Sequence, residues 1–148
     1  MIESERKTIS ILIADDDDDD VMLVTKALKE YRFLNDLQRV RDGEELLDYL
    51  FHRGNYTDAD KFPLPNLILL DLNMPRKDGR EALKEIKDHH ELRKIPVIIL
   101  TTSKTDEDIV RSYDLGVNSF VTKPVEFKDF MEVIKNIGTY WLEIVQLP

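Results

Sequence analysis

Five polar side chains suited to ionic or nucleophilic chemistry stand at the ends of short apolar runs in this 148-residue chain. They are Asp15, Asp16, Asp71, Thr101 and Lys123. Taken alone, an aspartate in such a position is usually a helix cap or a turn residue. A lone threonine there is more often a turn hydroxyl, and a lone lysine is more often solvated. In open α/β sheets, however, ligands bind at the carboxyl ends of the strands, so we expect these five side chains to converge.

The expected site has a definite chemistry. Three carboxylates placed together repel one another and need a cation, and hard oxygen ligands favour Mg²⁺. Lys123 would add a fixed positive charge and Thr101 a hydroxyl donor. An aspartate can act as a covalent nucleophile, and positive charges stabilise the oxygens of a phosphoryl group in transfer. Asp71 lies most centrally and is the predicted nucleophile.

The elements that must position these residues alternate along the chain. Apolar runs predict strands at Ile9–Ala14, Leu37–Arg41, Leu67–Leu70, Val97–Leu100 and Ser119–Thr122. Helical spacing of apolar residues predicts helices at about Asp18–Tyr31, Glu44–Arg53, Arg80–His89, Asp106–Leu115 and Phe127–Val145. The segments Gly54–Pro65 and Asp71–Gly79 are expected to be loops. This alternation predicts an α/β fold with a parallel sheet and helices on both of its faces.

Six consecutive aspartates, Asp15 to Asp20, follow the first predicted strand. Such a block often forms a solvated tail, but this one lies between a strand and a helix. Asp17–Asp20 are expected at the start of the helix, where negative charge is favoured and one of them caps it. The alternative is a direct role in metal binding. His89, His90 and His52 are expected to be exposed residues near helix ends rather than ligands.

Composition limits the remaining possibilities. The formal net charge of −9 argues against non-specific binding to nucleic acids and against docking on anionic membranes. The absence of cysteine excludes disulfides and thiolate metal sites and suggests a cytoplasmic protein. The first ten residues lack the apolar region of a signal peptide, and no apolar run is long enough to span a membrane. The length suits one domain, residues 1–148, with a core of about 9–138 and an extension of about 139–148.

Four segments, ILIADD, LILLDLNMPRKDG, VIILTTS and FVTKP, resemble the signature segments of two-component response-regulator receiver domains. They occur in the family order, and the resemblance spans about residues 9–145. It implies that a sensor histidine kinase phosphorylates Asp71. It implies that Asp15, Asp16, Asp71 and the backbone carbonyl of Asn73 bind Mg²⁺. Lys123 would pair with the phosphoryl group, through a cis peptide to Pro124.

The same resemblance implies a flavodoxin-like, doubly wound fold. Its sheet would have five strands in the order 2-1-3-4-5, with five helices and an extended C-terminal helix or tail. Thr101 and Phe120 would form the pair of residues that switches on phosphorylation. The loop Gly54–Pro65, the segment RKDGRE and the terminal YWLEIVQLP are similar to single-domain regulators paired with bacterial phytochrome kinases.

A hydrolase and a scaffold are the two alternative classes of function. A metal-dependent hydrolase of phosphate esters would use similar chemistry, but Asn73 stands where such an enzyme would have a second, acid–base aspartate. A scaffold with a vestigial site is disfavoured by the complete set of five polar residues. No output domain is expected, so the signal would leave through protein contacts, a further phosphorelay or a role as phosphate sink.

A homodimer is also expected, built on the fourth helix, the fifth strand, the fifth helix and the tail. The last helix carries apolar residues at spacings of three and four, and one such stripe must cover the sheet. Beyond Gly138 the stripe continues with Tyr140 and Trp141, which would be exposed in a monomer. Exposed apolar surface of this kind marks a contact. The alternative is that this overhang folds back onto its own domain.

Overall fold

The computed structural model describes residues 9–29, 34–72, 74–77, 79–101, 119–122 and 127–138. In these ranges the strands are β1 (Ile9–Ala14), β2 (Leu34–Val40), β3 (Leu67–Asp71), β4 (Val97–Thr101) and β5 (Ser119–Thr122). The α-helices are α2 (Asp18–Leu28), α3 (Gly43–Leu50), α4 (Gly79–Asp88) and α6 (Phe127–Gly138). Two short 3₁₀ helices, η1 (Gly54–Tyr56) and η2 (Leu92–Lys94), complete the set.

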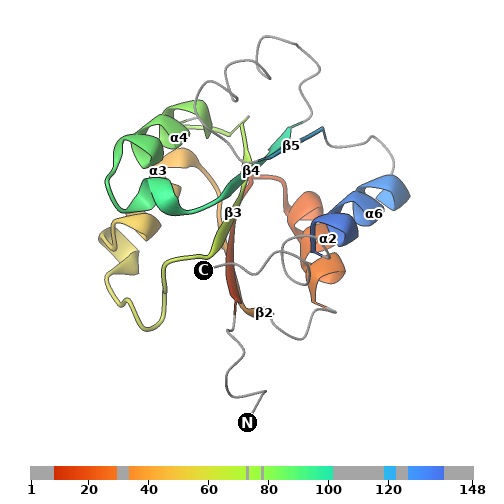
Figure 1. Cartoon of the computed structure of the whole chain (residues 1–148), viewed down its shortest axis with the longest axis horizontal. Helices are drawn as coiled ribbons and strands as arrows, with labels where there is room; N and C mark the ends of the chain where they lie inside the picture. Colours follow the sequence, from red (N-terminus) through yellow and green to blue (C-terminus); the bar gives the residue numbers. More distant parts are fainter. Residues whose placement is uncertain are drawn as a thin grey trace.

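The strands form one parallel sheet in the order β2-β1-β3-β4-β5. Figure 1 shows α3 and α4 on one side of this sheet and α2 and α6 on the other. The prediction of an α/β fold with a parallel sheet covered on both faces is therefore confirmed. The predicted helix Asp106–Leu115 and the C-terminal extension of about 139–148 lie outside the described residues.

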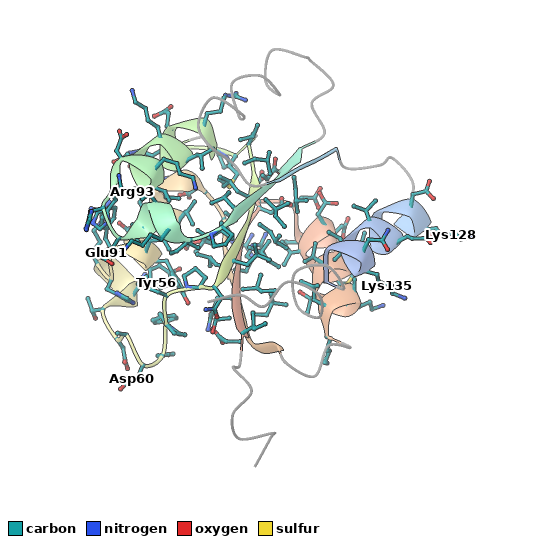
Figure 2. The ribbon with its side chains drawn as sticks, viewed as in Figure 1. Tyr56, Asp60, Glu91, Arg93, Lys128 and Lys135 are labelled. Carbon is teal, nitrogen blue, oxygen red and sulfur yellow. The ribbon has the colours of Figure 1, made fainter. Side chains whose placement is uncertain are left out.

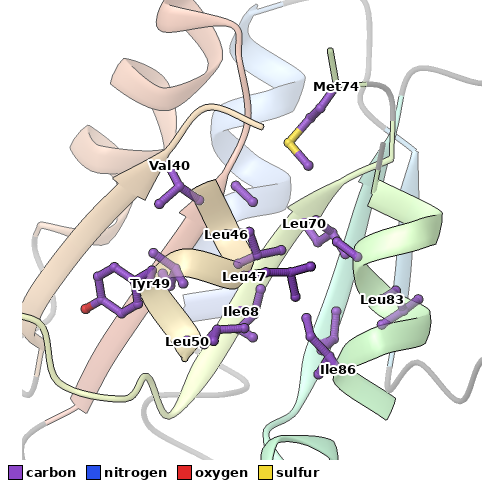
Figure 3. Packing of buried hydrophobic residues seen from close by; sticks show 14 of the residues in the cluster. Val40, Leu46, Leu47, Tyr49, Leu50, Ile68, Leu70, Met74, Leu83 and Ile86 are labelled. Carbon is purple, nitrogen blue, oxygen red and sulfur yellow. The ribbon is translucent and has the colours of Figure 1, made fainter. Parts of the chain in front are cut away.

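Alternate residues of each central strand enter two separate cores. Leu12 of β1 and Leu70 of β3 pack with α3 and α4. Figure 3 shows Leu70 among the side chains of this core. Ile13 of β1 and Leu69 of β3 pack on the opposite face with α2 and with Ile134 of α6. Because successive strand residues point to opposite faces, a strand buried on both sides must be apolar throughout. This requirement explains the uninterrupted apolar runs of the sequence.

The outer side of α6 is polar, as an amphipathic helix requires. Lys128 and Lys135 are exposed there and project away from the sheet (Figure 2). Ile134 on the inner side is fully buried, so the described part of the apolar stripe covers the core as expected. No helix within the described ranges is long and apolar enough to cross a membrane.

Several predicted element boundaries are corrected. The helix expected to reach Tyr31 ends at Leu28, with Lys29 as its C-cap residue, whose amide still bonds to the carbonyl of Thr25; residues 30–33 lie outside the described ranges. The second strand begins at Leu34 rather than Leu37, since its pairing with β1 extends to Ile9. It ends at Val40, one residue before the predicted end.

Corrections also apply to β3, β4 and the helices α3 and α4. Asp71, predicted to open a loop, is the last residue of β3 and pairs in register with Leu100. The fourth strand likewise extends one residue to Thr101, and α4 begins one residue early, at Gly79. Helix α3 ends at Leu50 instead of Arg53, because His52 adopts a left-handed backbone with φ of 53°.

The expected polar loop Gly54–Pro65 has an aromatic interior. The rings of Tyr49, Tyr56 and Phe62 contact one another, with centroids 4.8 to 5.8 Å apart. The hydroxyl of Tyr49 donates to the carbonyl of Pro63 at 2.9 Å. His52 lies half-buried, with Nε2 2.8 Å from the carbonyl oxygen of Phe62. The expectation that His52 is merely exposed is therefore wrong, since its ring anchors this segment.

His89 is also more than an exposed helix-end residue. Its Nδ1 accepts hydrogen bonds from the amides of Glu91 and Leu92, each at 3.1 Å. Its half-buried ring also contacts Phe51 edge to face, with centroids 5.2 Å apart. His89 thus closes the turn between α4 and η2, whereas His90 is exposed as expected.

Replacing Tyr49 with phenylalanine is expected to lower the free energy of unfolding by about 1–2 kcal/mol, because the carbonyl of Pro63 loses its buried donor. Burial raises the pKa of Tyr49 above its usual value of 10.0, so the folded state disfavours ionisation of this hydroxyl. The contribution of this hydroxyl to the free energy of unfolding is fully present below pH 10. It falls as the pH rises further, because the tyrosine of the unfolded chain then ionises before that of the folded chain. Urea unfolding at pH 7 and at pH 10.5 measures both effects: Tyr49→Phe should be less stable at pH 7 and less sensitive to alkali. Equal stability at pH 7 would contradict the role of the hydroxyl.

Candidate metal centre

Three carboxylates meet at the carboxyl edge of the sheet. Strands β1 and β3 are neighbours, and Ala14 pairs with Leu70, so the residues that follow them are brought side by side. Asp15, Asp16 and Asp71 each offer a carboxylate oxygen, and these oxygens lie within 4.8 Å of one another. Asp15 is 1% exposed and Asp71 6%, whereas Asp16 is open to solvent. Residues far apart in sequence thus form a compact acidic cluster.

The donor set of this cluster fits a hard divalent cation. All three ligands are carboxylate oxygens, which suit Mg²⁺, Mn²⁺ and Ca²⁺ rather than metals that prefer sulfur or imidazole. Burying two adjacent carboxylates is costly unless positive charge balances them. One open side, where Asp16 meets solvent, leaves room for water or a phosphoryl oxygen to complete the coordination. The arrangement can therefore hold a cation next to the carboxylate of Asp71.

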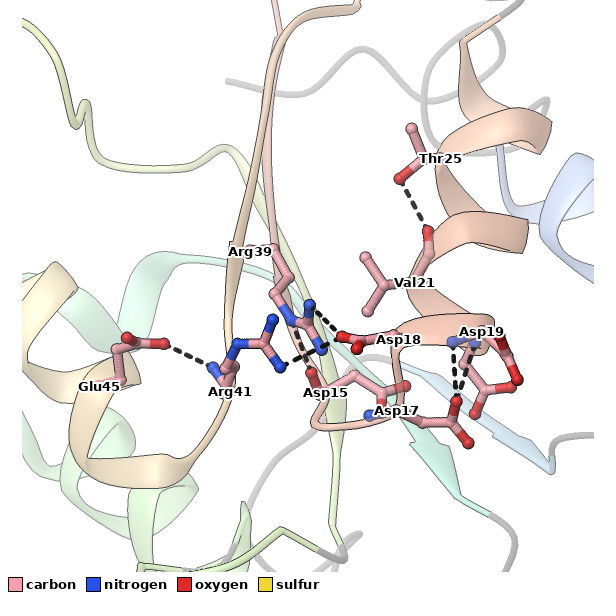
Figure 4. Close-up of polar contacts among 10 residues, drawn as sticks. Asp15, Asp17, Asp18, Asp19, Val21, Thr25, Arg39, Arg41 and Glu45 are labelled. Atoms are coloured by element: carbon pink, nitrogen blue, oxygen red, sulfur yellow. Dashed lines mark hydrogen bonds and ion pairs between the residues drawn. The ribbon is translucent and has the colours of Figure 1, made fainter.

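The backbone of Asp15 is fixed by strand β2. Its amide donates to the carbonyl of Val40, and its own carbonyl accepts from Nε of Arg39, both at 3.0 Å. Its side chain accepts from the amide of Asp17 at 2.9 Å, which turns the chain toward α2. Figure 4 shows Arg39 and the start of α2 gathered around this turn.

The remaining aspartates of the acidic run make contacts that stabilise the start of α2. Asp17 caps α2 by accepting from the amides of Asp19 and Asp20, at 2.9 and 3.3 Å. Oδ1 of Asp18 pairs with Nη1 of Arg39 at 2.8 Å and with Nη1 of Arg41 at 3.2 Å. The hydrogen bond from Arg39, aided by the charge of Arg41, lowers the pKa of Asp18. The capping interpretation of Asp17–Asp20 is confirmed, and none of the four belongs to the three-carboxylate cluster in the described residues.

The chain that follows Asp71 is held against the start of α3. The amide of Gly43 donates to the carbonyl of Lys77 at 2.8 Å. The guanidinium of Arg76 contacts Asp42 at 3.3 Å and also pairs with Glu44. These contacts tie the β3–α4 connection to a second element, which limits its freedom beside the acidic cluster.

Other predicted site residues are placed only in part. Thr101 is the last residue of β4 and follows Leu100, which pairs with Asp71. Phe120 of β5 pairs with Ile99 of β4. The backbones of Thr101 and Phe120 therefore reach the expected region of the sheet. Lys123, Asn73 and the peptide to Pro124 lie outside the described residues. Arg39, Arg41 and Arg76 are not among the predicted site residues. For the first pair a signal existed, since two arginines spaced by two at a strand end lie on the same face.

A parallel α/β sheet with three carboxylates at its carboxyl edge fits a site for a hard divalent cation. The chain belongs to the response regulator receiver domain family, whose model matches residues 11–135. Its function is that of the family, in which the receiver domain accepts a phosphoryl group and pairs with histidine kinases.

Three relatives are notably similar. Response regulator Rcp1 of Synechocystis sp. is 44% identical over 138 residues, 93% of this chain and 92% of the relative. The phosphorylated cyanobacterial phytochrome response regulator RcpA superposes with a TM-score of 0.90 at 40% identity, over 95% of this chain and 99% of that one. The Mn²⁺-bound form of Rcp1 superposes with a TM-score of 0.87 at 42% identity and the same coverage. A probable methanogenesis regulatory protein, FilR2 of Methanothrix harundinacea, is 39% identical over 96% of this chain and 88% of its own length.

Proposed function

We propose that this chain accepts a phosphoryl group on Asp71 from a sensor histidine kinase, with Mg²⁺ held by Asp15, Asp16, Asp71 and the backbone carbonyl of Asn73. The observation that carries the proposal is the pair of buried carboxylates, Asp15 and Asp71, next to the exposed carboxylate of Asp16. The related Rcp1 has a Mn²⁺-bound form, which supports binding of a divalent cation by this chain.

In the proposed reaction a carboxylate oxygen of Asp71 attacks phosphorus. The new oxygen–phosphorus bond forms as the bond from phosphorus to the histidine nitrogen of the kinase breaks, and the nitrogen keeps the electron pair. Asp15 and Asp16 hold the cation, which when bound neutralises charge on the phosphoryl oxygens. Lys123 pairs with the phosphoryl group, and the hydroxyl of Thr101 donates to it. The chain supplies the nucleophile, the ligands of the cation, the ammonium and the hydroxyl, so it promotes its own phosphorylation and the later loss of phosphate to water.

The proposed output is a conformational switch. Phosphate on Asp71 draws the hydroxyl of Thr101 inward and leaves space that Phe120 occupies, which biases a two-state element. The signal then passes through protein contacts. We further propose a single cytoplasmic receiver domain with five helices around its sheet. It would form a homodimer through the fourth helix, fifth strand, fifth helix and C-terminal tail.

The partner kinase is proposed to be of the phytochrome type. RcpA, a cyanobacterial phytochrome response regulator, shares 40% of its residues with this chain across nearly the full length of both. The bacteriophytochrome response regulator AtBRR is 42% identical over 91% of the chain, with a TM-score of 0.70. Phosphotransfer from a purified phytochrome kinase, compared with kinases of other sensor types, tests this pairing.

Labelling with acetyl phosphate tests the central proposal. The wild-type chain should incorporate one phosphoryl group with Mg²⁺ and none with excess EDTA, and peptide mapping after borohydride reduction should place it on Asp71. Asp16→Ala should raise the Mg²⁺ concentration for half-maximal labelling by at least about tenfold, because losing a ligand costs no less than losing a group that orients one. A steady release of phosphate from simple phosphate esters, without a labelled protein, would instead indicate a hydrolase. Labelling that is insensitive to EDTA would contradict the metal site.

A further inference from the structure

Arg39 of β2 contacts both sides of the turn that carries Asp15 and Asp16. Its Nε donates to the carbonyl of Asp15 at 3.0 Å, and its Nη1 binds the carboxylate of Asp18 at 2.8 Å. We propose that Arg39 is a positioning residue for the metal centre, holding the Asp15–Asp16 peptide in the orientation that the cation requires. This inference rests on the proposed function, in which Asp15 and Asp16 bind a divalent cation.

The contact acts on the backbone that joins the two carboxylates. The carbonyl of Asp15 belongs to the planar peptide unit that leads into Asp16, so holding this oxygen fixes the plane from which Asp16 departs. Together with the bond from the Asp15 amide to Val40, it anchors both polar backbone groups of Asp15 to β2. A bond from a charged donor is stronger than a neutral one. Functional groups must be held within about half an ångström to act well, so this second anchor is useful at a metal site.

The burial of Arg39 is consistent with a role beyond stability. Its side chain is only 21% exposed, and Nη2 is buried with no hydrogen-bond partner among the described residues. A buried donor without a partner costs free energy. The guanidinium thus occupies a costly position, from which its other nitrogens span Asp15 and the first turn of α2.

Arg41 provides a matched control. It binds the same oxygen of Asp18 at 3.2 Å and carries the same charge, but it is 58% exposed, and its backbone amide donates to the carboxylate of Glu45. Removing either guanidinium makes the acidic cluster more negative, which by charge alone strengthens cation binding. Loss of a group that holds the metal ligands in place weakens cation binding instead. A comparison of Arg39→Gln with Arg41→Gln therefore separates the two effects.

Binding of Mn²⁺ to the full chain, followed by electron paramagnetic resonance, is the first measurement. Arg39→Gln should weaken binding about tenfold, the usual effect of removing a group that orients a metal ligand. Arg41→Gln should bind as tightly as wild type or more tightly. In labelling by acetyl phosphate, Arg39→Gln should need about tenfold more Mg²⁺ for half-maximal rate, while its rate at saturating Mg²⁺ returns close to wild type.

The outcomes distinguish this inference from the proposed function. Wild type that binds no Mn²⁺, or binds it equally after Asp16→Ala, overturns the metal site and with it the role of Arg39. Normal wild-type binding together with equal Mn²⁺ affinity in the two arginine variants overturns the positioning role alone. If Arg39→Gln does not fold by circular dichroism, Arg39→Lys decides, because it keeps the charge but lacks the planar fork that spans both acceptors. Several-fold weaker binding of Mn²⁺ by Arg39→Lys supports the inference, and wild-type affinity overturns it.

Discussion

Asp71→Asn is expected to abolish phosphorylation by acetyl phosphate or by a kinase. The amide has nearly the same shape as the carboxylate, but it is neutral and is not a nucleophile for phosphorus. It also removes one of the three charges that recruit the cation. Intact-mass spectrometry after incubation with acetyl phosphate and Mg²⁺ should show one added phosphoryl group on wild type and none on the variant.

The fold of this variant should survive, and its stability gives a second test. Without metal, Asp15, Asp16 and Asp71 repel one another, so Asp71→Asn should raise the free energy of unfolding in EDTA. Added Mg²⁺ should stabilise wild type through preferential binding to the folded state, and it should stabilise the variant much less. Asp16→Asn is the matched control, since it removes the same charge but keeps the nucleophile and should still be labelled at high Mg²⁺. Full labelling of Asp71→Asn at another residue would refute the assignment.

The position of Asp71 shows what the sequence can predict and why. Uninterrupted apolar runs such as Leu67–Leu70 indicate strands buried on both faces, and parallel strands bring their carboxyl ends to one edge. The adjacency of Asp15 and Asp71 follows from this rule together with the order of neighbouring strands, which the family resemblance implied. The predicted end of β3 falls one residue short, because an aspartate after an apolar run is typical of a loop unless its ladder partner, Leu100, is known.

The contacts of Arg39 could not be predicted in the same way. They depend on the register of β2 against β1, and β2 is the strand whose boundaries the sequence indicated least well. The aromatic interior of the Gly54–Pro65 segment has a similar cause. Tyr56 and Phe62 follow neither the helical nor the strand period, so their contact with Tyr49 becomes visible only in three dimensions.

Gly79→Ala is expected to destabilise the protein although alanine favours helices. Gly79 opens α4, where alanine normally gains up to about 1 kcal/mol over glycine. A Cβ at this position, however, would lie 2.5 Å from the carbonyl oxygen of Asp71 and 2.7 Å from Cα of Leu72. Both neighbours are backbone atoms that cannot rotate away. Overpacking of this kind costs about 1–3 kcal/mol in free energy of unfolding, more than the helix propensity returns.

The same substitution should slow phosphorylation, because relief of the clash moves the backbone of Asp71 relative to Asp15. A misplacement of about 1 Å at a reacting group can cost about a hundredfold in rate. Urea unfolding and the initial rate of labelling by acetyl phosphate measure the two effects, with Lys84→Ala as control, since Lys84 is exposed on the same helix. Lys84→Ala should stay within about 0.5 kcal/mol of wild type and keep its labelling rate.

A Gly79→Ala protein as stable and as reactive as wild type would mean that α4 can shift without disturbing Asp71. The close approach of Gly79 to the Asp71 carbonyl would then be a by-product of packing. Loss of both properties would show that the start of α4 fixes the nucleophile in place.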